Sequence, residues 1–211
     1  MNSILCQRRG LLLATVGALV LGTLPAALSP ALADPDPAVS SIQRLTDGLL
    51  QVMRSGNGTP FQQRYGVLNP VITQVFDLPL ILKESVGPTW DTLPPDQQKM
   101  LQDAFERYTV SSYVNSFDAY NGQQFIVHPD TRAVGADQVV RTEIIPRSGD
   151  KHVLDYVMRN TGGGWKVVDV LADGSVSRVA VQRSDFRRLL AKGGAPALAE
   201  SLQTKSAALS G

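Results

Sequence analysis

The sequence predicts an α+β fold in which helices come first and a mainly antiparallel sheet follows. Apolar residues recur with the helical period up to about residue 113, and four runs rich in β-branched and aromatic residues follow between residues 123 and 171. A helical pattern returns after Asp173-Gly174. Strands that are grouped in one stretch, and do not alternate with helices, indicate an α+β architecture.

The first 33 residues read as a signal peptide that is removed from the mature protein. Two arginines precede the apolar stretch 10–28, and Ala31-Leu32-Ala33 supplies the small residues of a cleavage site. Pro25 and this site favour cleavage, although the apolar stretch approaches the length of a membrane anchor. The arginine pair leaves the twin-arginine route open beside the preferred general secretory route. We therefore expect an exported protein whose mature chain begins at Asp34.

Residues 34–211 are predicted to form a single domain. They contain no cysteine, so the hydrophobic core must hold the fold without disulfides. A chain of this length can bury about 70% of the surface that it exposes when unfolded, which is sufficient for one core. Loss of the two leader arginines changes the formal net charge from +1 to −1. Because a near-neutral chain lacks the basic field that binds phosphate backbones, we expect no nucleic acid partner.

Helical patterns precede and follow the predicted sheet. Asp77 is the expected N-cap of one helix, with Pro79 in its first turn, and Asn69-Pro70 is expected to interrupt the segment before it. Gly193-Gly194 is expected to separate the last two helices. The predicted helical segments are 39–53, short turns within 60–74, 77–86, a long helix that starts within 90–95 and reaches about residue 113, 179–190, and a last helix from Pro196.

Both faces of the predicted sheet carry apolar residues. Ser148-Gly149-Asp150 and Gly162-Gly163-Gly164 are hairpin turns, and 129–135 is a predicted loop. A sheet that is apolar on both faces needs helices or a ligand on both. The predicted strands are 123–127, 138–145, 152–159 and 165–171, in which Leu154, Tyr156 and Met158 alternate with Val153, Asp155 and Val157, and Trp165, Val167, Asp169 and Leu171 alternate with Lys166, Val168 and Val170.

A series of short motifs lies in order along residues 37–202. The first half contains Phe76-Asp77-Leu78-Pro79, Val86-Gly87-Pro88-Thr89-Trp90, Gln97-Gln98-Lys99, Ala104-Phe105 and Tyr113. The second half contains Tyr120-Asn121-Gly122-Gln123, Gly164-Trp165-Lys166-Val167-Val168-Asp169-Val170, Asp173-Gly174-Ser175-Val176-Ser177 and Arg183-Ser184-Asp185-Phe186. Together, and in this order, these motifs resemble the Mla or toluene-tolerance family of periplasmic phospholipid-binding proteins.

The resemblance implies both a fold and a function. It implies a cystatin-like or nuclear-transport-factor-like roll, in which a curved sheet of about four strands is wrapped by about six to seven helices that enclose acyl chains. It implies lipid transfer between the inner and outer membranes, with an inner-membrane lipid transporter complex and an outer-membrane lipoprotein or porin complex as partners. Arg178 stands where the family has an aliphatic residue, which is closer to the hopanoid-associated branch. The expected cargo is therefore a phospholipid or a hopanoid.

Aromatic residues gather where the long helix meets the sheet, as a lipid cavity would require. Tyr113 and Tyr120 can line an apolar wall while their hydroxyls reach a polar end. Ordinary core packing explains any single candidate equally well, and Trp90 and Trp165 are better interpreted as core anchors. The candidate lipid-contacting residues are Val75, Phe76, Phe105, Tyr108, Tyr113, Phe117, Tyr120, Phe125, Val140, Ile144 and Tyr156.

Arginines flank the later elements and are candidates for contact with a lipid head group or a partner. The planar guanidinium fork suits phosphate and carboxylate groups. A solvated surface is the simpler interpretation for each one. The candidates are Arg141, Arg147, Arg178 and Arg187.

Little in the mature sequence indicates catalysis, so we expect neither an enzyme nor a cofactor. His128 and His152 match no zinc spacing, and could form only a weak site with Asp130 or Asp150. Rolls of this shape also include isomerases and dehydratases, for which Asp155 or Asp169 would be the base. A periplasmic protein adaptor is a further alternative, and it predicts a filled core with an exposed apolar patch.

Overall fold

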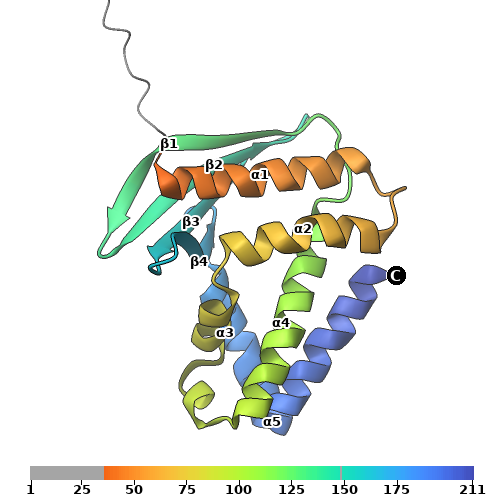
Figure 1. The fold of residues 1–211 in the computed structure, drawn as a ribbon, viewed down its shortest axis with the longest axis vertical. Coiled ribbons are helices and arrows are strands. Elements are labelled where there is room, and N and C mark those ends of the chain that lie inside the picture. The colour runs from red at the N-terminus through yellow and green to blue at the C-terminus, as the bar shows by residue number, and fades with distance from the viewer. Residues whose placement is uncertain (1–35, 148) are drawn as a thin grey trace, which may run out of the picture. The chain divides into compact units, whose positions relative to one another are not determined.

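The computed structural model describes residues 36–147 and 149–211, and the predicted signal peptide lies outside them (Figure 1). Within the described residues there are five α-helices, one 3₁₀ helix and a five-stranded antiparallel sheet. The predicted α+β class is therefore confirmed. The sheet has one strand more than expected, and the helix count differs slightly from the expected six to seven.

Helix α1 spans Pro37–Ser55 and presents one buried stripe to the core. The Asp36 side chain accepts a hydrogen bond from the Ala38 backbone N–H at 2.8 Å, and Gly56 ends the helix with a φ of 72°. Val39, Ile42, Leu45, Leu49 and Val52 are fully buried along the stripe. The helical period of the sequence predicted this stripe correctly.

Helix α2 spans Phe61–Val75 without interruption, so the predicted break at Asn69-Pro70 is wrong. Pro70 lies inside the helix, where proline costs about 3 kcal/mol. Leu68, Ile72 and Val75 are fully buried on the same helix, and each contributes about 1.5 to 3 kcal/mol. Burial of this face therefore outweighs the local cost of the proline.

The next segment places Trp90 in the core between two helices. The carboxylate of Asp77 accepts a hydrogen bond from the Leu80 N–H at 3.1 Å at the start of α3 (Leu78–Val86), as predicted. The 3₁₀ helix Gly87–Thr92 follows and buries Trp90. Helix α4 begins only at Pro95 and extends to Ser116. The segment 90–95, predicted as the start of one long helix, therefore contains the end of the 3₁₀ helix and the first residue of α4.

The sheet has the simple order β1-β2-β3-β4-β5, with antiparallel neighbours throughout. Its strands are β1 (Gln124–Val134), β2 (Asp137–Ile145), β3 (His152–Asn160), β4 (Trp165–Ala172) and β5 (Val176–Ser177). The predicted loop 129–135 is wrong, because β1 continues through it with a register shift between Val127 and Thr131. This irregularity accommodates Pro129 on an edge strand, where proline is tolerated. The two residues of β5 are too few to give a sequence pattern.

A second irregularity corrects the predicted alternation in β4. The register shifts between Val157 and Met158, so that Val167 pairs with Met158 and Val170 pairs with Tyr156. Val167 and Val170 both pack with the core, although strict alternation placed them on opposite faces. One extra residue in a bulge reverses the side on which the following residues lie.

The helices pack against one face of the sheet only. Val140, Tyr156, Met158 and Val167 join the core cluster with the helices, and α1 lies along β1 and β2 (Figure 1). The alternate residues of the central strands lie outside this cluster within the described part of the chain. We call this second side the outer face, formed by Ile126, His128, Arg132, Asp137, Val139, Arg141, Glu143, Val153, Asp155, Val157 and Arg159. No helix of the described residues covers the outer face, so the expectation of helices on both faces is wrong, while cover by a ligand stays a prediction.

Helix α5 spans Arg178–Ser210 and contains a kink at Gly193 and Gly194, where the backbone leaves the helical region. Its two segments correspond to the two predicted helices on either side of that glycine pair. The Ser177 hydroxyl accepts a hydrogen bond from the Ala180 N–H at 3.0 Å and caps the first segment. In the described residues, no helix is long and apolar enough to span a membrane.

Candidate binding site

A cavity of about 340 Å³ opens on the helix-covered side of the sheet. It lies among α3, α4, the end of β4 and the first turns of α5. This volume is within the range of about 300 to 1,000 Å³ typical of small-molecule sites. Most of its lining is apolar, and the polar lining residues are Thr109, Ser112, Ser116, Asp169, Arg178 and Gln182.

Five of the predicted lipid-contacting residues line this cavity, namely Phe76, Phe105, Tyr108, Tyr113 and Phe117. The other predicted residues do not line it. Val75, Val140 and Tyr156 are buried in the core, Phe125 packs against Phe117, Ile144 is half-buried, and Tyr120 is exposed. Trp90 is a buried core residue and Trp165 is half-buried against the core. The apolar lining residues that the sequence did not single out as candidates are Leu78, Ile81, Leu154, Val170, Ala172 and Val179, and the polar ones are Thr109, Ser112, Ser116 and Gln182.

Stacked aromatic rings form one wall. The ring of Tyr113 lies 5.5 Å from that of Phe76 and 6.0 Å from that of Phe117, and the second pair is nearly parallel. Phe117 in turn lies 6.0 Å from Phe125 on β1. Rings in offset or tilted contact stabilise one another beyond their burial. The wall is therefore an apolar surface formed by Phe76, Tyr113 and Phe117, and Phe125 packs against it from β1.

Burial keeps Tyr113 uncharged. Desolvation raises the pKa of its phenol well above the usual value, Tyr156 adds to this, and the positive charge of Arg178 opposes it. The side chain therefore remains neutral at physiological pH. A neutral phenol can contact hydrocarbon with its ring and still offer a hydroxyl to a polar group.

Hydroxyl groups follow one face of α4 along the cavity. Thr109, Ser112 and Ser116 are spaced three and four residues apart, so they project on the same side of the helix. Ser112 Oγ donates to the Tyr108 carbonyl at 2.8 Å. The Thr109 hydroxyl is buried and has no hydrogen-bond partner in the described part of the chain. A buried hydroxyl without a partner is costly, so Thr109 is available to a polar atom of a ligand.

A carboxylate at the edge of the cavity is already occupied by donors. Asp169 Oδ1 accepts hydrogen bonds from the N–H groups of Val170 at 2.8 Å and Val179 at 3.1 Å. Its Oδ2 accepts one from Ser177 at 2.5 Å. These bonds hold the start of α5 against β4. Asp169 therefore has a structural role in positioning the helix that carries Arg178.

Comparison with known proteins identifies the family. Residues 43–204 match the model of the family described as "MlaC protein". The chain belongs to the MlaC family. The resemblance that the ordered motifs predicted is thereby confirmed, while assignment to a hopanoid-associated branch stays a prediction.

Two individual proteins are similar to this MlaC-family chain. It is 28% identical over 111 residues to the toluene tolerance protein ttg2D of Pseudomonas putida, and the match covers 52% of each protein. The alignment thus spans about half the length of this curated relative. The structure of a phospholipid-binding protein from Ralstonia solanacearum, solved in complex with a phospholipid, superimposes with a TM-score of 0.71. That match covers 82% of this chain and 99% of the other at 23% identity, and it shows a shared fold.

The MlaC-family structure does not support the catalytic alternative. Asp155 lies on the outer face, on the opposite side of the sheet from the cavity, and pairs with Arg141. Asp169 reaches the cavity but is held by the three donors described above. A general base needs a carboxylate within reach of its substrate and free to accept a proton. Neither predicted aspartate meets both conditions.

The two histidines of this MlaC-family chain do not come together. His128 lies on the outer face, 3.5 Å from Glu143, whereas His152 pairs with Ile144 on the other side of the sheet. Among the described residues, no group of three potential metal ligands is present. The weak metal site considered from the sequence is therefore not formed there.

The four candidate arginines lie in different places. Arg178 lines the cavity, and Arg141 lies on the outer face. Arg187 lines a second hollow of about 290 Å³ between the end of α3 and α5, and Arg147 is exposed beside Gly122. Arg178 alone among them is therefore placed to contact a ligand in the main cavity.

Proposed function

We propose that this MlaC-family protein binds a phospholipid or a hopanoid and carries it through the periplasm. The observation that carries the proposal is the aromatic-walled cavity of about 340 Å³, which has hydroxyls along one side and Arg178 in its lining. The related Ralstonia solanacearum protein, which shares the fold, was solved with a phospholipid. Five lining residues coincide with those selected from the sequence for lipid contact.

Carriage of hydrocarbon requires an enclosed apolar space. Shielding about thirty methylenes from water contributes on the order of 25 kcal/mol, and a surface patch cannot supply this. Transfer from a bilayer into a cavity exchanges one apolar environment for another, so the net free energy of loading is close to zero. Such a carrier can take up and release its cargo without a chemical step. The enzyme and adaptor alternatives are therefore not adopted.

The cavity volume bears on the number of chains that the protein encloses. At about 340 Å³ the cavity is near the lower end of the range for ligand sites, so it encloses only part of a two-chain lipid. A two-chain cargo therefore requires the cavity to widen, or leaves part of its chains outside it. Measuring the mass of the bound lipid gives its number of chains.

The remaining parts of the proposal follow from the sequence. Residues 1–33 direct export and are removed, and residues 34–211 act as the single lipid-binding domain. The proposed partners are an inner-membrane lipid transporter complex and an outer-membrane lipoprotein or porin complex. Lipid is exchanged with these partners on either side of the periplasm.

Neutralising the arginine at the cavity should weaken binding of an anionic lipid. We expect Arg178→Gln to lower the affinity for phosphatidylglycerol about tenfold, because a charge-assisted hydrogen bond to the phosphate is lost. Fluorescence titration with a labelled phosphatidylglycerol measures the affinity, and vesicle-to-vesicle transfer of the same lipid measures carriage.

Arg187→Gln provides a matched control, because it removes the same charge from the same helix outside the main cavity. Its affinity should stay within about twofold of the unmodified protein. Equal losses in the two variants would exclude a specific role for Arg178. Failure of the unmodified protein to bind or transfer lipid would contradict the proposed function itself.

A further inference from the structure

The ion pairs on the outer face bury their carboxylates and expose their cations. The carboxylate side chains are only 2% exposed in Asp155 and 15% exposed in Glu143 and Asp137. The cationic side chains that pair with them are between 47% and 60% exposed, and these are Arg132, Arg141, Lys151 and Arg159. In these ion pairs, the cation is therefore the partner that meets solvent.

Ion pairs elsewhere in the described residues do not share this arrangement. In the pairs Lys83–Asp91, Lys99–Asp103, Arg183–Glu84 and Arg188–Asp185, the carboxylate side chains are between 47% and 69% exposed. These are ordinary solvated pairs on helices and their connections. The asymmetry of the outer face is thus a property of that face, and not of the whole protein.

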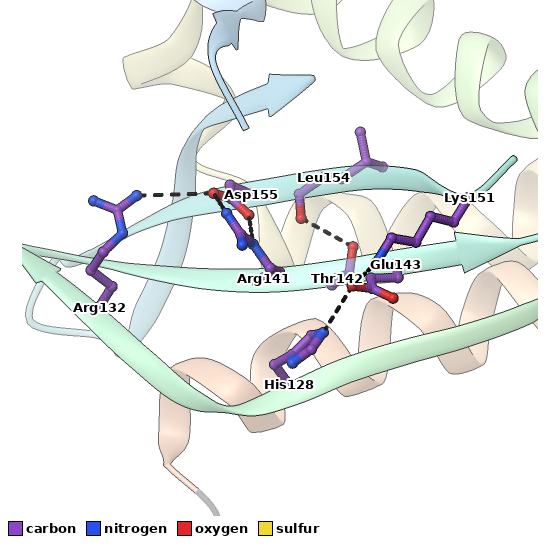
Figure 2. A network of polar contacts seen from close by, with 8 residues as sticks. All are labelled: His128, Arg132, Arg141, Thr142, Glu143, Lys151, Leu154 and Asp155. Carbon is purple, nitrogen blue, oxygen red and sulfur yellow. Dashed lines mark hydrogen bonds and ion pairs between the residues drawn. The ribbon is translucent and has the colours of Figure 1, made fainter. Parts of the chain in front are cut away.

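The buried carboxylates hold the cations in place. Asp155 receives two hydrogen bonds from Arg141, at 2.8 and 2.9 Å, and Arg132 approaches the same carboxylate to 3.9 Å from β1 (Figure 2). Gly174, with a φ of 71°, lies beside this pair, and a Cβ there would be in ordinary van der Waals contact with both partners, at 3.6 Å. Glu143 binds Lys151 at 2.9 Å, and this hydrogen bond lowers the pKa of Glu143. Side chains fixed before binding lose less entropy when a partner pairs with them.

Apolar residues lie between these cations. Val139 is buried and Val153 and Val157 are half-buried on the outer face, while Ile126 is one of the large apolar side chains that remain exposed. The aliphatic stems of the arginines and the lysine border this row, as such stems commonly do on apolar surface. An apolar centre with a charged rim is typical of protein interfaces. Three exposed acids lie nearby: Asp130 in the irregular part of β1, Asp150 in the turn before β3, and Asp173, which precedes Gly174 and donates its backbone N–H to the Val153 carbonyl.

The position of the outer face indicates what kind of partner fits it. The lipid cavity lies on the other side of the sheet, so a bilayer in contact with the outer face would not meet the cavity. A protein bound there leaves the cavity free for exchange. Carboxylates are the groups that best complement arginine forks on a protein surface. We infer that the outer face docks an acidic protein surface, whose aspartates and glutamates pair with Arg132, Arg141 and Arg159 on this face and with Lys151 beside it.

The inference concerns an interaction surface and does not depend on the cargo. Poly-L-glutamate serves as a probe for protein carboxylates, and vesicles of pure phosphatidylglycerol serve as a probe for an anionic membrane. We expect poly-L-glutamate to bind at low ionic strength, to be released by salt, and to shift the backbone amide signals of β1, β2 and β3 in NMR spectra. Binding at the same concentration to the vesicles through these strands is not expected.

A charge-matched pair of variants locates the interaction. Arg132→Gln with Lys151→Gln removes two exposed cations and leaves the Arg141–Asp155 pair intact, so the fold is preserved. It should weaken poly-L-glutamate binding about tenfold. Lys99→Gln with Arg188→Gln removes the same charge from α4 and α5, and should change binding less than about twofold. Thermal unfolding of both double variants confirms that they are folded.

Three results would overturn the inference. The first is an absence of poly-L-glutamate binding by the unmodified protein, and the second is an equal loss in the two double variants. The third is binding of the vesicles, but not of poly-L-glutamate, through β1 to β3, which would make the outer face a membrane surface. In each case lipid binding by the cavity stays a separate question, because the titration with labelled lipid tests it independently.

Discussion

Replacing Ala172 with tryptophan is expected to abolish lipid binding while the protein stays folded. Ala172 lies at the end of β4, pairs with Leu154 on β3, and lines the cavity together with it. An indole at this position occupies the space that hydrocarbon would fill. Because the side chain enters an open cavity and not a packed core, its cost should stay below the 1 to 3 kcal/mol typical of overpacking. We expect affinity for a labelled phospholipid to fall at least about tenfold, as for loss of a well-buried anchor.

A tryptophan on the surface separates the effect of filling from the effect of the residue type. Ala133 is exposed on β1, so Ala133→Trp adds the same side chain away from the cavity. This variant should bind lipid as the unmodified protein does, and circular dichroism should show both variants folded. Unchanged affinity in Ala172→Trp would mean that the lipid does not occupy this cavity.

Removing the arginine above Asp155 is expected to cause the largest loss of stability among single surface changes. Asp155 is buried on the outer face, and Arg141 supplies both of its hydrogen bonds, at 2.8 and 2.9 Å (Figure 2). After Arg141→Ala, only Arg132 at 3.9 Å remains near the carboxylate. Loss of this partner leaves the buried Asp155 carboxylate without its counter-charge, and the partial exposure of Arg141 makes the cost smaller than that for a fully buried pair. Urea unfolding measures the free energy directly.

Two further variants distinguish this cause from a general effect of charge. Arg188→Ala removes an arginine whose partner Asp185 is exposed, so it should cost less than about 1 kcal/mol. The double variant Arg141→Leu with Asp155→Leu removes the uncompensated charge, and it should recover most of the lost stability. A loss of stability in Arg141→Ala no larger than that in Arg188→Ala would show that Asp155 does not depend on this pair.

The sequence predicted the elements that local chemistry determines. The Asp77 cap, the proline in the first turn of α3 and the glycine pair within α5 all occur where local rules place them. The buried stripe of α1 followed from its period. Ordered motifs also identified the family, because each motif marks a cap, a turn or a core residue of the same fold.

The elements that were predicted wrongly depend on tertiary structure. Pro70 and Pro129 both looked like local breaks, yet α2 and β1 continue through them. In α2 the burial of a helix face compensates for the proline, and in β1 an irregularity on an edge strand accommodates it. Neither compensation leaves a signal in neighbouring residues. The sequence also did not indicate that helices cover only one face of the sheet. Long basic side chains lie on the other face, where helices or a ligand were expected.

Only part of the candidate site was predicted, because the rest also depends on tertiary structure. The aromatic residues of α4 stood out by their density, and Phe105, Tyr108 and Tyr113 line the cavity. The contributions of β4 depend on the register shift near Met158, which brings Val170 onto the core side. Arg141 looked equivalent to Arg178 in sequence, but strand pairing places it on the outer face. The side on which a strand residue lies was therefore the main missing information.

Native mass spectrometry of the protein, purified gently from a bacterial host, tests the central claim most directly. The account predicts the mass of residues 34–211 plus one lipid, with the added mass identifying a phospholipid or a hopanoid and its number of chains. Ala172→Trp prepared in parallel should show the mass of the chain alone. An unmodified protein that carries no lipid, and takes none up from vesicles, would contradict the claim that the cavity carries hydrocarbon.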